Sequence, residues 1–230
     1  MEANETLSRR AYIDLRSDIM YGRLRPNSKL KLDELGKRYQ VGTTPIREAL
    51  HLLSSEGMVQ HAEQKGFRVS SLSLSEYADI LEIRCWFEER ALRTSIEHGC
   101  EKWEDALVLS QYHLAKTPRW LNCEQGQEAN IKWEISHQNF HAALISACPS
   151  SILLKYCAEL YNQNSRYCFI SHIESDPKRN KRNIRDEHAE IAEAALARNA
   201  DLACELLLAH YRNSGEILLK KLDIENDDLA

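Results

Sequence analysis

One stretch, residues 41–59 (VGTTPIREALHLLSSEGMV), limits most strongly what this chain can fold into. Thr44 followed by Pro45 predicts a helix start, because a hydroxyl caps a helix and proline suits its first position. Gly57 predicts the helix end. Between them, apolar side chains recur at spacings of three and four, as in a helix with one buried face: Ile46, Ala49, Leu50 and Leu53.

The opposite face of this helix is polar, and its side chains carry hydrogen-bonding groups: Thr43, Thr44, Arg47, Glu48 and His51. A short helix with a buried stripe and a polar leading end can enter a DNA major groove, where its first residues reach the base edges. An ordinary amphipathic surface helix explains this stretch alone equally well. The flanking sequence therefore has to decide between the two interpretations.

The residues before this helix predict a helix-turn-helix. Residues 32–39 (LDELGKRY) form a second short amphipathic pattern, and residues 40–43 are a gap of the size of a turn. A further helix is predicted over residues 11–21, ended by Gly22. Residues 23–31 are predicted to be a connecting arm whose basic side chains are available to phosphates.

The residues after it predict a hairpin. Residues 58–61 and 66–69 alternate apolar and polar side chains on either side of residues 62–65, with a basic tip at Lys65 and Gly66. A helix, a helix-turn-helix and a hairpin in this order make a winged helix. The predicted DNA contacts are Thr43, Thr44, Arg47, His51, Lys65 and Gly66.

Residues 12–69 resemble the DNA-binding domain of GntR-family transcriptional regulators. The resemblance rests on IMYGRLRPNSKL, TTPIREAL, EGMV and KGFRV. The chain has Gly42 and Thr43 where the family usually has Ser-Arg, and Asn27 where the family has glycine after the proline. The absent arginine removes one base contact that the family would imply, so we expect an operator that differs from the family's commonest one.

Charge is divided unevenly along the chain, which has a net charge of −5. Residues 1–70 hold 12 Lys and Arg against 9 Asp and Glu, whereas the rest holds 18 against 26. The basic excess therefore accompanies the helix-turn-helix, where phosphates would need it. No apolar run suggests a membrane span or a signal segment, and we expect a cytoplasmic protein. The seven cysteines are scattered without a CxxC spacing, which favours reduced thiols.

The predicted fold is mainly α, with an N-terminal winged helix-turn-helix in residues 1–70 and an all-helical bundle in residues 74–230. Residues 71–73 are a short linker within SSLS. Residues 1–8 and 224–230 are predicted to be irregular. Six helices are expected in the second domain, with a loop at 117–127: 74–98, 101–116, 128–147, 150–171, 184–198 and 201–222.

Four histidines fall on three of these predicted helices. His137 and His141 are four residues apart, which puts both imidazoles on one helix face. His188 and His210 lie on the last two helices. Each alone is more simply a surface or core histidine. Together, flanked by apolar residues, they indicate a metal site, because neutral imidazole is a common ligand of zinc and nickel.

The second part of the chain resembles the all-helical FCD effector domain of FadR-type GntR regulators. The matching stretches are RCWFE, HQNFHAALISAC and RDEHAEIAEAALARNADLACELLLAH. Many such domains hold a divalent metal through Asp, His, His and His, and the resemblance assigns the three histidines to His141, His188 and His210. His137 stands where the family has aspartate, which favours zinc, with nickel or manganese as alternatives. Around HQNFH the chain is also similar to carbon-starvation-type repressors of glutarate catabolism.

Arginines are the candidates for binding an effector carboxylate, because guanidinium binds carboxylate through two parallel hydrogen bonds. Arg166 is preferred, since it lies among apolar residues. Arg84 is the second candidate, although it is four residues from Glu88 and its simplest role is an ion pair along the helix. Asn213, one turn beyond His210, is a weaker candidate.

These features predict a ligand-responsive repressor of a catabolic operon. We expect a homodimer that binds palindromic operator DNA, senses a small carboxylate at the histidine-ligated metal, contacts no membrane and is not an enzyme. One alternative is a metal-dependent hydrolase, since HQNFH has the spacing of HExxH, with Gln138 at the place of the general base. The other is a DNA-binding protein whose helical domain is purely structural.

Overall fold

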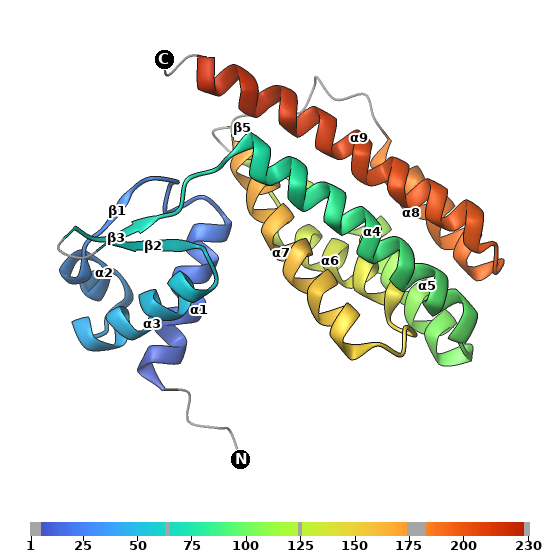
Figure 1. The fold of residues 1–230 in the computed structure, drawn as a ribbon, viewed down its shortest axis with the longest axis horizontal. Coiled ribbons are helices and arrows are strands. Elements are labelled where there is room, and N and C mark those ends of the chain that lie inside the picture. The colour runs from blue at the N-terminus through green and yellow to red at the C-terminus, as the bar shows by residue number, and fades with distance from the viewer. Residues whose placement is uncertain (1–5, 63–64, 124–125, 174–182, 228–230) are drawn as a thin grey trace. The chain divides into compact units, whose positions relative to one another are not determined.

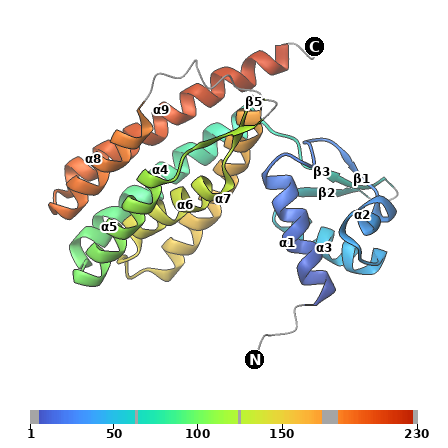
Figure 2. The ribbon, with the colours of Figure 1, turned by 180° about the vertical axis from the view of Figure 1, so that it is seen from behind.

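The computed structural model describes residues 6–62, 65–123, 126–173 and 183–227. The chain divides into two compact units, Met1–Ser73 and Leu74–Ala230, seen from two sides in Figures 1 and 2. Each unit has its own hydrophobic core. None of the helices among the described residues combines the length and apolar composition that a bilayer crossing needs.

The described residues of the first unit form three helices and a three-stranded antiparallel sheet. The strands are ordered β1-β3-β2, and Val59 pairs with Val69 across β2 and β3. The predicted winged helix-turn-helix fold is confirmed. Its elements are α1 (Leu7–Met20), β1 (Lys29–Leu30), α2 (Leu32–Tyr39), α3 (Thr43–Ser55), β2 (Val59–Ala62) and β3 (Gly66–Val69).

Strand β1 lies where the sequence predicts only a connecting arm. Lys29 pairs with Arg68 and Leu30 with Phe67, so the arm occupies the free edge of β3. The turn before β1 requires a left-handed residue, and Asn27 has φ 63°. Asparagine is enriched in this region among residues other than glycine. Asn27, which stands where the family has glycine, can therefore adopt the backbone conformation that the turn requires.

Helix α3 starts two residues earlier than the sequence predicts, at Thr43. Gly42 is its N-cap, in an extended conformation and without a side-chain cap, so the prediction that Thr44 caps the helix is wrong. Pro45 is the third helical residue instead of the first. This costs no hydrogen bond, because the first four N–H groups of a helix have no acceptor within it.

Helix α1 also starts earlier than predicted, at Leu7. The Thr6 hydroxyl accepts a hydrogen bond of 3.3 Å from the Arg9 amide, which caps the first turn. Residues 6–8 are therefore ordered by a local cap that the sequence interpretation overlooked.

A buried aspartate ties the helix-turn-helix to α1. Asp18 is only 6% exposed within an otherwise apolar core. One of its oxygens accepts from Arg23 at 3.0 Å, and the other lies 2.5 Å from Arg38 and 2.6 Å from the Tyr39 hydroxyl. Burial, and then the bond to Asp18, raise the pKa of Tyr39 above its ordinary value, so the phenol remains a donor. These bonds join α1 to the end of α2.

The second unit is a helical bundle, as the sequence predicts, with one hairpin added. Its elements are α4 (Leu74–His98), α5 (Glu101–Lys116), β4 (Trp120–Cys123), β5 (Gly126–Ala129), α6 (Ile131–Ile145), α7 (Ser151–Ile173), α8 (Ile184–Leu196) and α9 (Ala200–Asp227).

The hairpin β4–β5 replaces the predicted loop at 117–127 and the first residues of the predicted third helix. Asn130 explains the later helix start. Its side chain caps α6 by accepting from the Lys132 amide at 3.0 Å, and its own amide group donates to the Pro118 carbonyl at 2.6 Å. Helix α9 extends to Asp227, beyond the predicted end at residue 222, so the first residues of the tail expected to be irregular are helical.

Helices α4 and α9 pack side by side, and α4 also packs on α7 (Figure 1). The close approach of α9 depends on Gly215. A Cβ atom at this position would lie 2.3 Å from Cδ2 of Leu81 on α4. Large side chains that are fully buried in this unit include Phe140, Leu144, Ile191 and Leu207.

We expect Asp18→Ala to lower the free energy of unfolding of the first unit by roughly 1–3 kcal/mol, because it leaves the Tyr39 hydroxyl without its acceptor. Urea unfolding followed by circular dichroism measures the change. Asp14→Ala, one turn earlier on α1, is the matched control. Equal stability of the two variants would contradict a structural role for Asp18.

Candidate DNA-binding surface and metal centre

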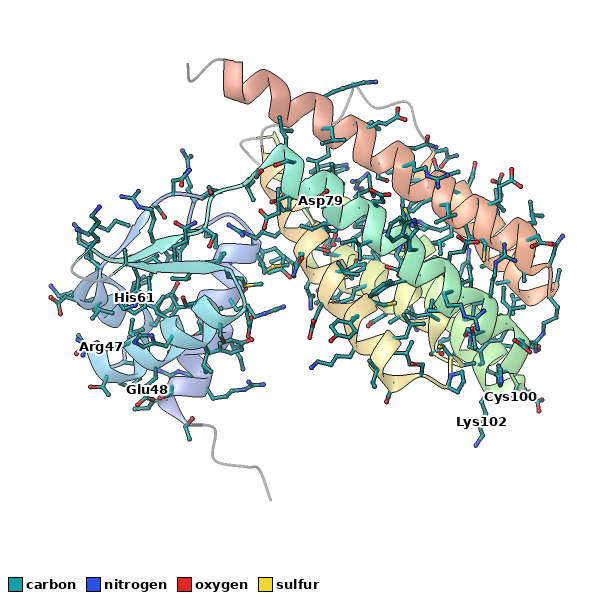
Figure 3. The ribbon with its side chains drawn as sticks, viewed as in Figure 1. Arg47, Glu48, His61, Asp79, Cys100 and Lys102 are labelled. Atoms are coloured by element: carbon teal, nitrogen blue, oxygen red, sulfur yellow. The ribbon has the colours of Figure 1, made fainter. Side chains whose placement is uncertain are left out.

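The polar face of α3 is solvent-exposed, while its apolar stripe forms the core. Ile46, Leu50 and Leu53 are fully buried, whereas Thr43, Thr44, Arg47 and His51 are exposed. Figure 3 labels Arg47 and Glu48 on this helix and His61 on the neighbouring strand β2. The first turn of α3 contains no acidic residue and has no side-chain cap. Its N–H groups and its dipole therefore favour an anion such as a phosphate.

The tip of the hairpin lies between β2 and β3. Lys65 is exposed, and its amide donates to the Ala62 carbonyl at 3.1 Å. Gly66 has φ 77°, a conformation that glycine adopts without strain. The other two residues of the tip, 63 and 64, lie outside the described residues.

His61 joins the predicted surface residues, although the sequence interpretation did not select it. Its ring stacks on Phe67 at 4.5 Å between centroids, and the ring of His51 lies 5.1 Å from both. The register explains why it was missed. The predicted turn of residues 62–65 would pair His61 with Gly66, whereas Ala62 pairs with Gly66 and His61 with Phe67.

The second unit brings the four candidate histidines together. His137 and His141 come from α6, His188 from α8 and His210 from α9. One ligating nitrogen from each lies within 4.8 Å of all the others. His141, His188 and His210 are buried, and His137 is partly buried. The geometry therefore assembles a set of imidazole donors from helices far apart in the chain.

Neighbouring side chains orient two of these rings. The Glu187 carboxylate lies 2.8 Å from Nδ1 of His210, and because an ionised carboxylate only accepts, this nitrogen carries the hydrogen. Nδ1 of His137 lies 2.8 Å from the Tyr161 hydroxyl, which has Glu134 as its acceptor at 3.4 Å. Both contacts engage Nδ1 and leave Nε2 for a ligand. Such outer partners usually orient metal-binding histidines.

The donor set fits a divalent metal. Nε2 of His137 lies 3.0 Å from Nε2 of His141. Nitrogen ligands about 2.0–2.1 Å from one ion lie roughly 3.0–3.4 Å from each other, so this pair is already at a ligand spacing. Burial, and then the neighbouring imidazoles, hold the pKa of His137 and His141 well below the ordinary value, so both are neutral and can bind a metal.

A cavity of about 90 Å³ adjoins the cluster. His137 and His210 line it together with Arg84 and Glu134. Burial raises the pKa of Glu134 to about 7, although the nearby Arg119 opposes this shift. The cavity therefore combines imidazoles, two arginines and one carboxyl group whose charge changes near neutral pH.

Arg84 is buried in the wall of this cavity and paired with Glu88. Its Nε lies 2.6 Å from a Glu88 oxygen, so the ion pair anticipated from their spacing is present. Burial lowers the pKa of Arg84, but Glu88, Tyr211 and Tyr161 together raise it above its ordinary value, so the guanidinium is charged. Its Nη2 is buried and has no hydrogen-bond partner among the described residues. Arg84 thus forms the anticipated ion pair and also lines the cavity.

The other two predicted effector residues do not line this cavity. Arg166, preferred on the sequence, is 7% exposed. Burial lowers its pKa, and the nearby Tyr167 and Glu76 oppose this shift. Asn213 is exposed on α9. The apolar neighbours of Arg166 and the helical spacing between Asn213 and His210 do not indicate the direction in which either side chain faces.

Several polar residues of the lining were missed, among them Arg119, Glu134 and Ser214. Arg119 lies over the ring of Trp133 at 4.9 Å, and Ser214 follows Asn213 on α9. Arg119 follows Pro118 in the segment predicted as a loop, where helical periodicity gives no direction. Gln138, which matters for the hydrolase alternative, is exposed and its amide lies 3.5 Å from Asn162.

Comparison with known proteins gives consistent matches for both units. Residues 7–69 match the gntR family of bacterial regulatory proteins, and residues 79–213 match the FCD domain. The HTH-type transcriptional regulator BphR of Paraburkholderia xenovorans is 36% identical over 200 residues, which cover 87% of this chain and 80% of that protein. The HTH-type transcriptional repressor GlaR of Escherichia coli is 34% identical over 200 residues, covering 85% and 88%.

Among solved structures, E. coli McbR/YncC is similar in fold. The match has a TM-score of 0.75 at 19% identity and covers 94% of this chain and 99% of that one. At this identity the likeness concerns the fold alone.

Proposed function

This chain belongs to the GntR family of bacterial regulatory proteins with an FCD domain, and on that premise we propose that it represses a catabolic operon in response to a small carboxylate. It is a DNA-binding transcriptional regulator. The family and its relatives are regulators of transcription, which confirms the expectation that the chain is not an enzyme. The name of GlaR supports repression, and operator binding implies action in the cytoplasm.

The proposed operator contact is made by α3 and the hairpin. Arg47 is exposed near the start of α3, where a side chain reaches the floor of the major groove. Thr43 and Thr44 precede it, and His51 follows one turn later. Lys65 and Gly66, at the hairpin tip, would lie against the phosphate backbone or the minor groove.

The proposed effector site is the cavity beside the histidine cluster. The single observation that carries the proposal is the convergence of four imidazoles beside a cavity that Arg84 also lines. Nη2 of Arg84 is buried and has no hydrogen-bond partner among the described residues. A bound zinc, nickel or manganese ion would offer open coordination positions to a carboxylate oxygen. Arg84 would bind the other oxygen, with Arg119 as a second cation in the same wall.

Helix α4 provides a route from the effector to the DNA. It carries Arg84 and begins at Leu74, directly after the linker. A carboxylate that draws Arg84 toward the histidines would shift α4, and the linker would pass this shift to the recognition helices. An effector changes operator affinity whenever it prefers one of two such arrangements.

We further propose that the protein is a homodimer that reads a palindromic operator. Large apolar side chains are exposed on α4 and α7, which pack together, and we assign this apolar patch to the dimer interface. It consists of Ile83 and Trp86 on α4 and Ile152 and Tyr156 on α7, and Trp86 is 62% exposed. Large exposed apolar patches mark association sites, and a two-fold dimer matches two half-sites.

Arg47→Ala should lower the preference for operator over random DNA by roughly 1–3 kcal/mol, because arginine can bind guanine through two hydrogen bonds. Fluorescence anisotropy at fixed salt measures both affinities. Lys65→Ala should instead weaken both by a similar factor and reduce the salt slope by about one. An Arg47→Ala protein with the parent's preference would show that α3 does not read the bases.

His188→Ala should abolish tight metal binding while leaving operator affinity without effector unchanged, because the winged helix is untouched. Metal content after dialysis and anisotropy measure the two properties. His113→Ala, which removes an exposed histidine on α5, should behave as the parent. If His188→Ala retains the full response to carboxylates, the metal takes no part in the switch.

Trp86→Glu should convert the dimer to a monomer, because it replaces the most exposed apolar side chain of α4 with a charge. Equilibrium sedimentation at tens of micromolar detects the change. Val108→Glu on α5, where the residue is similarly exposed, is the matched control and should stay dimeric. A dimer in both variants would locate the interface elsewhere.

A further inference from the structure

Four buried side chains form a continuous chain of contacts from the histidine cluster to Arg84. Nδ1 of His141 lies 2.9 Å from the Tyr211 hydroxyl, which contacts Oε2 of Glu88. Oε1 of Glu88 lies 2.6 Å from Nε of Arg84. None of the four residues is more than 5% exposed, so water does not compete for these bonds. The chain links α6, α9 and α4.

The positions of these atoms allow two arrangements of hydrogens. In the first, Tyr211 donates its single hydrogen to Glu88, which only accepts. Tyr211 can then only accept from His141, so Nδ1 of His141 carries the hydrogen and Nε2 keeps its lone pair. In the second, Nε2 of His141 carries the hydrogen and donates to Nε2 of His137 at 3.0 Å. Nδ1 then accepts from Tyr211, and Glu88 loses a donor.

Metal binding selects between the two arrangements. Nε2 of His141 cannot carry a hydrogen while it binds an ion, so only the first arrangement is compatible with the metal. Without an ion, the lone pairs of His137 and His141 face each other at 3.0 Å, and the second arrangement resolves this repulsion. The state of the cluster therefore determines whether Tyr211 donates to Glu88.

The same choice determines the position of Arg84. In the first arrangement two donors hold Glu88, and the guanidinium lies 3.9 Å over the Tyr211 ring. Its Nη2, which has no partner among the described side chains, is then held in the cavity wall. In the second arrangement, lone pairs of Tyr211 and Glu88 face each other at contact distance. Glu88 must move away, and Arg84 moves with it.

We propose that Tyr211 and Glu88 are positioning residues that couple metal binding at His141 to the placement of Arg84 for an anionic ligand. The inference rests on the proposed metal and effector site and adds its regulation. The metal would prepare the arginine as well as contribute its own coordination positions. Metal and carboxylate would then bind cooperatively, each favouring the same hydrogen-bond arrangement.

Arginine-labelled protein and Zn²⁺ alone test the coupling, with no effector needed. The ¹⁵N–¹H signal of Arg84 Nε, assigned by its loss in Arg84→Lys, should shift when the full-length parent is saturated with Zn²⁺. In Tyr211→Phe, which keeps the ring and removes the hydroxyl, saturating Zn²⁺ should leave this signal in place. Competition with a chelator should show a Zn²⁺ affinity about 10–100-fold lower than in the parent, the usual effect of losing an outer partner.

Tyr167→Phe is the matched control, because it also removes a buried tyrosine hydroxyl that donates to a glutamate, Glu76, at 2.6 Å. It should keep both the Arg84 shift and the Zn²⁺ affinity. If Tyr167→Phe loses the Arg84 shift and the Zn²⁺ affinity as Tyr211→Phe does, removal of any buried tyrosine hydroxyl has this effect. That result would contradict the proposal.

Two failures are distinguishable. A parent that binds Zn²⁺ without a shift at Arg84, or a Tyr211→Phe protein with the parent's shift, would overturn the coupling and leave the metal site intact. The parent measurement suffices even where Tyr211→Phe does not fold. A parent that binds no Zn²⁺ would overturn the proposed metal site and this inference with it.

Discussion

The second unit depends on the convergence of imidazole lone pairs in a buried site. Two nitrogens of neutral histidines, 3.0 Å apart, repel each other unless a hydrogen or a cation lies between them. Glu187 holds the hydrogen of His210 on Nδ1, and Tyr161 engages the same atom of His137, so Nε2 of both rings is left to face the site. The helices α6, α8 and α9 are thereby organised around one point, and the cavity proposed to bind the effector lies beside it.

Helix α4 connects this point to the rest of the molecule. Arg84 and Glu88 face the cluster through Tyr211, Gly215 lets α9 approach closely, and the N-terminal end of α4 follows the linker. In the first unit, Asp18 has a comparable role, since it fixes α2 relative to α1 and hence supports the presentation of α3. Each unit thus uses one buried polar contact to set the geometry of a functional surface.

Much of the fold could be predicted because its signals are local. The stripe from Ile46 to Leu53 and the four-residue spacing of His137 and His141 require only helical periodicity, and the bounds of α2, α4 and α5 follow from the same pattern. Features set by tertiary contact could not be predicted. Strand β1 forms because β3 has a free edge with which it can pair. His61 lies opposite Phe67 because the hairpin register differs from the predicted one. Arg84 rather than Arg166 lines the cavity because of the direction in which each side chain faces, which apolar flanks do not encode.

The proposed metal site requires the histidines to bind an ion through their Nε2 atoms. X-ray absorption at the metal edge of the zinc- or nickel-loaded protein identifies the ligands. We expect a first shell dominated by nitrogen at about 2.0–2.1 Å, with the outer scattering of three or four imidazole rings. A shell of oxygen alone, or sulfur from the cysteines at about 2.3 Å, would contradict it.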